Sequence, residues 1–365
     1  MHADLIPLDE LEDRDHEAWR EIADRAVEPN TFFEPEMVLP AVRWLAGGDV
    51  ALLVAKDEDG WAACLPVRRA SRWRKMPLRS LVVWRHQYSF LGTPLIDGTR
   101  AYRALAAVVE RAVKDRRASG FALDWVADDG AVSSALREVV EDSRLPCATF
   151  ESFERAALRR RPESSYLEET LSAKRRKRLR RLERRLGEDL GGAPRVTERG
   201  LEGGAPAGFA RLEAEGWKGR EGTALASNDR HARFFEEVCL GFAGTGRLQL
   251  LALQVGERTV AMQCNLVAGE ALFCFKVAYD EALARYSPGV QLELRAVDAF
   301  HAMSQVAWWD SCAAPDDELM NRLWPDRRRL ASVGIARPGL VGRSWVAGAR
   351  AGARVRERRR QRRSP

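Results

Sequence analysis

The clearest hydrophobic pattern lies in the C-terminal half of the chain, where three apolar segments follow one another. They are residues 248–255, 259–267 and 271–279. Two short turns separate them, built on Gly256-Glu257 and Gly269-Glu270. Short glycine-containing turns join neighbouring antiparallel strands. The pattern therefore predicts a three-stranded antiparallel meander.

A helix is predicted directly after this meander, over 288–303. Its apolar residues recur at helical spacing, at Val290, Leu294, Val297 and Phe300. Ser287 suits the N-cap and Pro288 suits the first helical position. A short apolar segment at 306–310 then predicts one more strand. The expected order is three strands, a helix and a strand.

The N-terminal half repeats this order of elements. Strands are expected at 50–55, 61–67, 78–84 and 121–126, with a helix over 99–117. We interpret the repeat as a diverged internal duplication, and its long period indicates two domains rather than a solenoid. The expected fold class is α/β (α+β), in which each domain has a mostly antiparallel mixed sheet flanked by helices.

A strongly basic segment separates the two halves. Nine of the twelve residues from 174 to 185 are Lys or Arg, and the apolar residues form one narrow stripe, Leu179, Leu182 and Leu186. The stripe predicts a helix docked on the protein with its basic side outward. Three readings stay open: a solvated face, a phosphate site that uses Lys174 and Arg178, or contact with nucleic acid or an anionic membrane surface. Nucleic acid is the least favoured, because no aromatic residues are interleaved.

These segments give the expected domain limits. They are an N-terminal domain at 1–160, a basic helix and loose linker at 161–206, a C-terminal domain at 207–335, and a basic, disordered tail at 336–365.

Composition narrows the class of protein. Of 365 residues, 45% are hydrophobic and 31% charged, and no run approaches the ~18 apolar residues of a membrane-spanning helix. The N-terminus has no basic segment followed by an apolar one, so we expect a cytoplasmic protein without a secretory signal. The six cysteines form no C-x-x-C pair and the five histidines are scattered. Reduced thiols and no metal site are therefore predicted.

The start of the predicted helix at Pro288 is the main candidate for ligand binding. The first turn of a helix has unpaired N–H groups and the positive end of the helix dipole, so it can hold a phosphate. Gly289 has no side chain to obstruct an anion. The N–H groups of Gly289, Val290 and Gln291 are expected to point at that anion.

This order of elements resembles the GNAT acyltransferase fold. In that fold the fourth strand splays from the fifth, acyl-CoA lies in the gap, and its pyrophosphate sits on the N-terminus of the helix between them. The resemblance implies that 271–279 is the splayed strand and 306–310 its neighbour, and that both domains are GNAT-like. It implies contacts to acetyl-CoA or another acyl-CoA by Val277, Arg285, Ser287, Gly289, Val290 and Gln291. Of the usual loop pattern, Gln/Arg-x-x-Gly-x-Gly/Ala, this chain keeps the Arg and one Gly.

Several motifs in one order give a narrower resemblance. They are Leu171–Arg181, Glu215–Thr223, Ala278–Glu281 and Tyr286–Gly289. They resemble GNAT proteins linked to cellulose and exopolysaccharide biosynthesis, which are related to FemABX-type aminoacyltransferases. The resemblance implies acyl transfer from CoA to an amine or hydroxyl of a small-molecule or lipid-linked saccharide. The alternatives are an aminoacyl-tRNA donor, as in FemABX-type proteins, and a non-catalytic module for nucleic acid or an anionic membrane surface.

Direct attack on a thioester needs an N–H donor for the developing oxyanion and a base for the nucleophile. The splayed edge from Lys276 to Tyr279 is expected to supply the donor. Strand alternation predicts that Lys276 shares a face with Leu272 and Cys274. There it either meets a phosphate or the thioester oxygen, or faces solvent.

The remaining candidates flank the predicted gap. Asp310 ends a strand at its mouth, where it could accept a proton or cap the following loop. Glu213 and Glu215 near a helix end are alternative bases, one of them on a solvated face. Trp217, beside Lys218, either stacks on a substrate sugar or closes a core, and the core reading is favoured.

Overall fold

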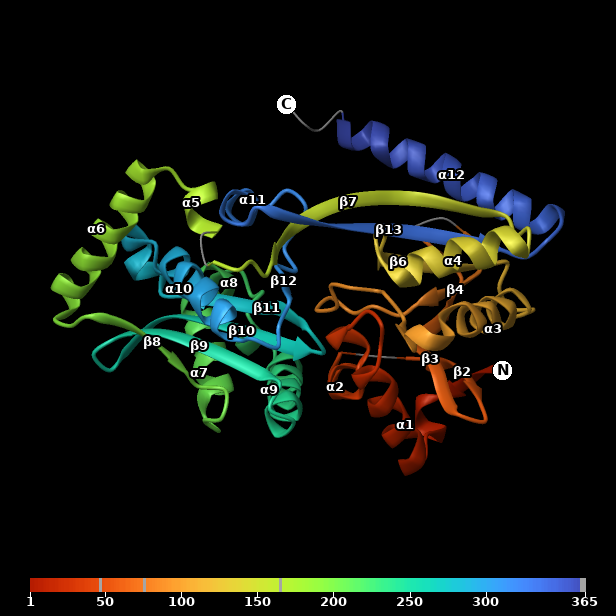
Figure 1. The fold of residues 1–365 in the computed structure, drawn as a ribbon, viewed down its shortest axis with the longest axis horizontal. Helices are drawn as coiled ribbons and strands as arrows, with labels where there is room; N and C mark the ends of the chain where they lie inside the picture. Colours follow the sequence, from red (N-terminus) through yellow and green to blue (C-terminus); the bar gives the residue numbers. More distant parts are fainter. Residues whose placement is uncertain (46–47, 75–76, 164–165, 362–365) are drawn as a thin grey trace. The chain divides into compact units, whose positions relative to one another are not determined.

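The chain folds into two units, each built on its own set of paired strands (Figure 1). The computed structural model describes residues 1–45, 48–74, 77–163 and 166–361. The first unit comprises residues 1–38, 47–154 and 328–365, and the second comprises 39–46 and 155–327. Residues 328–335, placed with the C-terminal domain by the sequence pattern, therefore lie in the first unit.

The sheet of the first unit has the strand order β1-β2-β3-β4-β6-β13-β7, and β5 pairs with β3. Its strands are β1 (His2–Pro7), β2 (Val50–Asp57), β3 (Gly60–Ala70), β4 (Ser80–Val83), β5 (Leu95–Ile96), β6 (Gly120–Ala127), β7 (Cys147–Arg159) and β13 (Asp326–Ala336). Its helices are α1 (Asp13–Asp24), α3 (Ala101–Val113), α4 (Ala131–Asp142) and α12 (Leu340–Gln361). Helix α2 (Pro35–Trp44) runs across the sequence boundary between the units.

The sheet of the second unit has the order β7-β12-β11-β10-β9-β8. Its further strands are β8 (Pro194–Glu198), β9 (Leu248–Val255), β10 (Arg258–Ala268), β11 (Ala271–Tyr279) and β12 (Trp308–Asp310). Its helices are α5 (Tyr166–Thr170), α6 (Ala173–Leu190), α7 (Ala205–Glu215), α8 (Trp217–Arg220), α9 (Asp229–Gly244), α10 (Pro288–Ala302) and α11 (Glu318–Leu323). The predicted meander and the helix after it are confirmed.

Helices cover both faces of the second sheet. Leucines of α6 and α10 share one hydrophobic core with β9 and β11. On the other face, the Phe235 ring of α9 stacks on Phe275 of β11 and lies against Phe209 of α7. Helix α10 is thus held against the sheet with its N-terminus next to the end of β11.

The two units repeat one topology, as the duplication predicted. In each, an antiparallel meander leads to a helix and then to a parallel strand: β4 pairs with β6, and β11 with β12. Each parallel strand then pairs with an antiparallel strand from the other half of the sequence. Strand β13 pairs with β6, and the end of β7 pairs with β12. The fold is therefore a tandem of GNAT-like mixed α/β units.

The prediction of a disordered tail at 336–365 is wrong for residues 340–361, which form α12. Its first turns carry Trp345, Val346 and Ala349, all buried against the first unit. The Trp345 ring lies so close to Gly120 and Gly334 that a Cβ at either position would clash with it. Small residues and arginines dominate the sequence of this segment, so no local pattern predicts its packing. Residues 362–365 lie outside the described part of the chain.

Candidate functional site

The gap predicted between the fourth and fifth strands is present in the second unit. Strands β11 and β12 pair in parallel only at Ala271–Trp308, Leu272–Trp309 and Phe273–Asp310. Strand β11 continues to Tyr279, paired on its other side with β10. Residues from Cys274 onward therefore have one edge that no strand covers within the described chain.

Helix α10 begins beside this open edge. Ser287 before it is left-handed, with φ 55°, a strained conformation for a residue before proline. Among the described residues, the N–H groups of Gly289 and Val290 have no hydrogen-bond acceptor, as expected for an anion site.

The expected role of Gln291 as a phosphate donor is wrong. Its N–H donates to the Ser287 carbonyl (3.0 Å), the first bond of the helix. Its buried side chain donates to the carbonyls of Tyr286 (3.1 Å) and Leu179 (3.5 Å). Gln291 therefore fixes α10 against α6 and is not available to a ligand.

The missing side chain of Gly289 makes room for a protein ring. A Cβ at this position would lie 3.3 Å from Cδ1 of Tyr279. The glycine was expected to clear space for an anion. Its Cβ direction is instead filled by Tyr279, which brings the end of β11 onto the first turn of α10.

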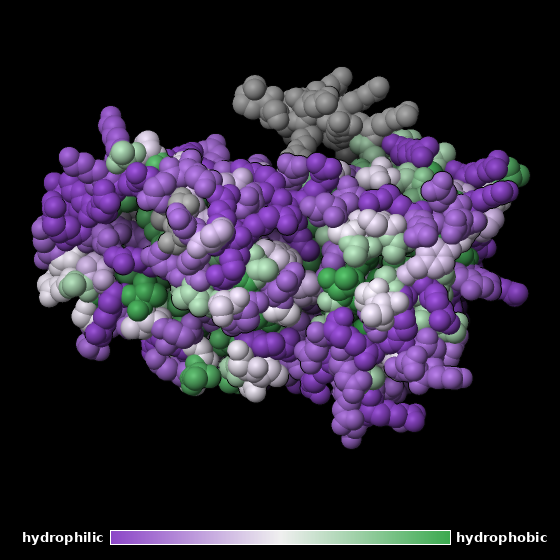
Figure 2. Space-filling view, in the orientation of Figure 1, coloured by the Kyte–Doolittle hydropathy of each residue, from purple (hydrophilic) through white to green (hydrophobic). Residues whose placement is uncertain are grey.

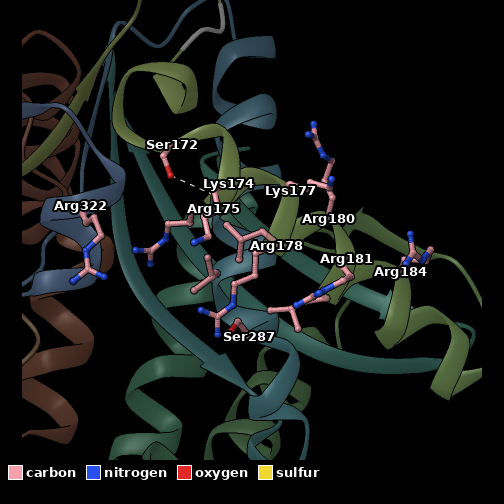
Figure 3. Close-up of a pocket in the computed structure, with 13 residues that line it drawn as sticks. Ser172, Lys174, Arg175, Lys177, Arg178, Arg180, Arg181, Arg184, Ser287 and Arg322 are labelled. Atoms are coloured by element: carbon pink, nitrogen blue, oxygen red, sulfur yellow. Dashed lines mark hydrogen bonds between the residues drawn. The ribbon is translucent and has the colours of Figure 1, made fainter.

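A groove of about 1000 Å³ runs between α6 and the start of α10 (Figure 3). Ser287 and Val290 line it from α10, and Lys174 and Arg178 line it from α6, as predicted. The further cations of its lining are Arg175, Lys177, Arg180, Arg181, Arg184 and Arg322. The basic segment that the sequence left unassigned therefore borders the helix start.

Most of these cations are uncompensated. In the described chain, carboxylates pair only with Arg184, through Glu188 (3.3 Å), and Arg322, through Glu318 (3.4 Å). Figure 2 shows a strongly hydrophilic surface over α6. Uncompensated cations around a helix N-terminus favour a phosphate-bearing ligand.

Arg285 lies outside this groove. Its exposed guanidinium is 3.5 Å from the carboxylate of Asp189 and lies over the Tyr286 ring. The Tyr286 hydroxyl also donates to Asp189. Arg285 therefore belongs to a cluster at the C-terminal end of α6, where the structure gives it no part in the groove.

A β-bulge at Phe275 changes the face of Lys276. Lys276 pairs with Cys264, whereas the next residue of β10, Asn265, pairs with Cys274. Phe275 is thus an extra residue, and the alternation shifts by one. The prediction that Lys276 shares a face with Cys274 is wrong. Lys276 instead lies on the α7 side, where its Nζ is 3.3 Å from Glu213 Oε1.

Glu213 is the centre of a buried charged cluster. It is 1% exposed and accepts hydrogen bonds from Lys218 Nζ (2.8 Å) and the Leu225 N–H (2.8 Å). Burial raises the pKa of Glu213, but Lys276, Lys218 and these hydrogen bonds outweigh it and lower the pKa overall. Burial lowers the pKa of Lys276 despite Glu213, and burial and Lys276 lower the pKa of His231.

A small pocket of about 30 Å³, room for about one water, lies between this cluster and the end of β11. Its lining includes Glu213, Trp217, Lys218, Val277 and Tyr279. Of the two glutamates, Glu213 therefore lies at the pocket, whereas Glu215 is exposed outside it. The favoured prediction that Trp217 closes a hydrophobic core is wrong, because the residue is 45% exposed.

Asp310 is not at the mouth of the gap. It is fully buried, and its Oδ2 accepts a 2.7 Å bond from Arg155, which is 1% exposed. Its Oδ1 accepts the Cys312 N–H at 2.9 Å. Both carboxylate oxygens are occupied within the core, and Asp310 lines neither the groove nor the small pocket beside β11 described above, so it is a structural ion pair and not an accessible base.

Two residues that the sequence analysis did not single out position α10. Arg160 donates to the carbonyls of Phe300 and His301 at the C-terminal end of the helix, and to the carbonyl of Val306 in the loop that follows it. Glu293, which is buried, accepts from Trp324 Nε1 (2.9 Å) and Gln263 Nε2 (2.9 Å). Burial raises the pKa of Glu293 to about 7.

Glu293 is expected to make stability pH-dependent. Its pKa is raised above the ordinary 4.5, so its stabilising contribution is complete below about pH 4.5 and is lost as the pH rises through about 7. Glu293→Gln should therefore be more stable than the parent at pH 8, by up to about 3 kcal/mol. Urea denaturation at pH 5.5 and pH 8 measures the difference.

Glu293→Leu is the matched control for this prediction. It removes the acceptor of Trp324 and Gln263 and should be destabilising at both pH values, because two buried donors lose their partner. A pH-independent difference between the parent and Glu293→Gln would contradict the assignment.

The equivalent gap in the first unit is closed by its own chain. Strands β4 and β6 pair at three positions, from Ser80–Gly120 to Val82–Ala122. Beyond them, the Gly92 N–H donates to the Trp125 carbonyl (2.9 Å), and Thr93 Oγ1 accepts the Ala127 N–H (2.9 Å). The first unit thus has no open strand edge at this place.

The helix of the first unit that corresponds to α10 also starts differently. The carboxylate of Asp97 caps the turn before α3 and is bound by Arg100. A carboxylate at that position disfavours an anion. Across the described residues, no helix has the length and apolarity needed to cross a membrane.

Comparison with known proteins agrees with this geometry. Residues 173–317 match the family model described as an acetyltransferase (GNAT) domain. The match begins with α6 and includes β12, the open edge of β11, and the groove-lining residues other than Ser172 and Arg322. Comparison with curated protein sequences finds no match.

Solved structures with the same fold have little sequence identity to the chain. FemX aligns with a TM-score of 0.60 and 10% identity, covering 92% of this chain and 97% of FemX. The C-terminal domain of a putative lysylphosphatidylglycerol synthetase from Agrobacterium fabrum aligns at 0.55, with 13% identity and coverages of 93% and 95%. L-PGS from Bacillus licheniformis aligns at 0.52, with 13% identity and coverages of 93% and 97%. Residues 173–317 are therefore similar to a GNAT-type acetyltransferase domain, within a fold that is similar to that of FemX.

Proposed function

We propose that the second unit is an acyltransferase that moves an acyl group from coenzyme A to an amine or hydroxyl acceptor. The observation that carries the proposal is the three-residue pairing of β11 with β12. It leaves an open strand edge beside a helix start with free N–H groups, inside a domain of the GNAT acetyltransferase type.

The donor is expected to bind along this edge. Its diphosphate would rest on the N–H groups of Gly289 and Val290, with Ser287 and the arginines of α6 around it. The acyl carbonyl would lie against the backbone between Lys276 and Tyr279. An N–H group of that unpaired edge then stabilises the oxyanion that forms when the acceptor attacks.

The small pocket supplies the groups for proton transfer. Glu213 lines it and is ionised at neutral pH because its pKa is lowered, so it can take the acceptor's proton directly or through one water. Lys276 and Lys218 hold this carboxylate in place. Tyr279 lines the same pocket and contacts Gly289, so its hydroxyl is proposed to protonate the leaving thiolate.

For the acceptor, we propose a saccharide or amino sugar. The exposed Trp217 beside the pocket offers an aromatic face on which a sugar ring can stack. The motif resemblance to proteins of polysaccharide synthesis supports the same class. A lipid-linked saccharide would place the reaction at a membrane surface, and contact with anionic lipid through α6 is part of this proposal.

An aminoacyl-tRNA donor is the second candidate. The observation in its favour is the number of uncompensated cations on α6, which suits a polyphosphate. The similarity in fold to FemX and to lysylphosphatidylglycerol synthetases agrees with it. This candidate predicts that free CoA does not bind and that affinity for RNA falls steeply with salt.

Thermal denaturation with acetyl-CoA, longer acyl-CoAs and free CoA tests the proposal. A ligand of the folded state stabilises it by RT ln(1 + [L]/Kd), so saturating donor at ~100 Kd should add about 2.7 kcal/mol. Titration calorimetry should give one site per chain, because the gap of the first unit is closed. No shift with any acyl-CoA would refute the CoA-dependent function. RNA binding without transfer would favour a non-catalytic module.

A further inference from the structure

The groove carries more positive charge than a diphosphate requires. Eight Lys or Arg side chains line it. Six of them, Lys174, Arg175, Lys177, Arg178, Arg180 and Arg181, have no carboxylate partner among the residues that the structure describes. The N–H groups at the start of α10 add a further partial positive charge. A ligand that brought only a diphosphate would leave most of this charge uncompensated.

We infer that the groove also binds a phosphate monoester of the donor, which in coenzyme A is the 3′-phosphate of the ribose. This inference rests on the proposed function and names a second anion site within the groove. A phosphate monoester carries about −1.5 to −2 charge at pH 7 and three acceptor oxygens, so two arginines bind it well.

Arg178 and Arg181 are the residues assigned to this monoester. Both line the groove, and in Figure 3 both side chains extend toward Ser287 at the start of α10. Arg180 and Arg184 extend away from Ser287 in the same view. Residues two apart on a helix, such as Arg178 and Arg180, lie about 200° apart around its axis. Of the cations that line the groove, Arg178 and Arg181 therefore extend toward the helix start, whereas Arg180 and Arg184 extend away from it.

Contacts within the protein hold α6 in this orientation. Leu179 and Leu186 are buried in the core that α6 shares with α10. The Leu179 carbonyl accepts from Gln291, and Glu183 pairs with Arg295 of α10 at 2.7 Å. Because these contacts fix the rotation of α6, the side on which each arginine lies is set by the fold.

Isothermal titration of the full chain with acetyl-CoA and with 3′-dephospho-acetyl-CoA tests the inference. Acetyl-CoA should bind at least about tenfold more tightly, and the difference should shrink as salt is raised. Equal affinities would overturn the inference and leave the proposed function intact. If neither compound binds, both the inference and the CoA-dependent function fail.

Two double variants of the same helix separate a local site from general attraction. Arg178→Ala/Arg181→Ala should abolish the preference for acetyl-CoA over the dephospho compound. Arg180→Ala/Arg184→Ala removes two groove cations whose side chains extend away from Ser287 and should retain the preference. Circular dichroism checks that α6 remains folded in both. If the two variants lose the preference equally, the cations act only through their summed field and the assigned site is refuted.

Discussion

Replacing Asp310 by alanine is expected to lower the free energy of unfolding by about 3–5 kcal/mol. The substitution leaves the guanidinium of Arg155 buried at 1% exposure without its carboxylate. It also removes the acceptor of the Cys312 N–H. Urea denaturation followed by tryptophan fluorescence measures the loss, since Trp309 is next to Asp310 and lies 4.5 Å from Trp324, ring to ring.

The double variant Arg155→Met/Asp310→Leu is the control for this prediction. It removes both charges, and exchange of a buried ion pair for apolar residues of similar size is often neutral or stabilising. It should therefore recover most of the stability that Asp310→Ala loses. If Asp310→Ala kept its stability but lost acyl transfer, the role of an accessible base would have to be restored to Asp310.

The ion pair explains why the predicted position of Asp310 was wrong. Asp310 is the charged residue at the end of the strand Trp308-Trp309-Asp310, and it was therefore expected at the mouth of the gap. Its partner Arg155 lies on β7, 155 residues earlier in the chain. No local pattern predicts that pairing, since β7 comes from the N-terminal half and completes the sheet of the second unit. A residue's exposure depends on such distant strands.

Strand β11 shows what local patterns do and do not determine. Its bounds, Ala271–Tyr279, agree with the prediction because a glycine turn and a loop delimit an apolar run. The bulge at Phe275 was not predicted, and one extra residue moved Lys276 to the other face. Lys276 therefore forms an ion pair with Glu213 and does not line the groove.

The sequence pattern could have distinguished Glu213 from Glu215, which were left as alternative bases. Glu213 follows the buried Phe209 by four residues, so both lie on the inward face of α7. Helical spacing alone therefore distinguishes it from the exposed Glu215. The groove on α6 is different, because only the docking of Leu179 and Leu186 shows which arginines turn toward α10.

Replacing Gly289 by glutamate is expected to weaken acyl-CoA binding by at least about 100-fold. The carboxylate would lie at the first turn of α10, next to the N–H groups of Gly289 and Val290, where its negative charge repels the donor's phosphate. A loss of this size corresponds to about 3 kcal/mol, comparable with one or two charge-assisted hydrogen bonds. Titration calorimetry with acetyl-CoA measures it.

Two further variants separate charge from shape in this experiment. Gly289→Ala adds only a Cβ, which meets the Tyr279 ring at 3.3 Å and requires it to shift by a few tenths of an ångström. A small loss of affinity is therefore expected. Gly208→Glu puts a carboxylate on α7, where an added Cβ has no neighbour within 4 Å, and affinity should not change. If Gly289→Glu bound acetyl-CoA as tightly as Gly289→Ala, no phosphate would lie at this helix start. The donor would then have to bind through the cations of α6 alone, without the helix start. Its affinity should in that case still fall as the salt concentration is raised.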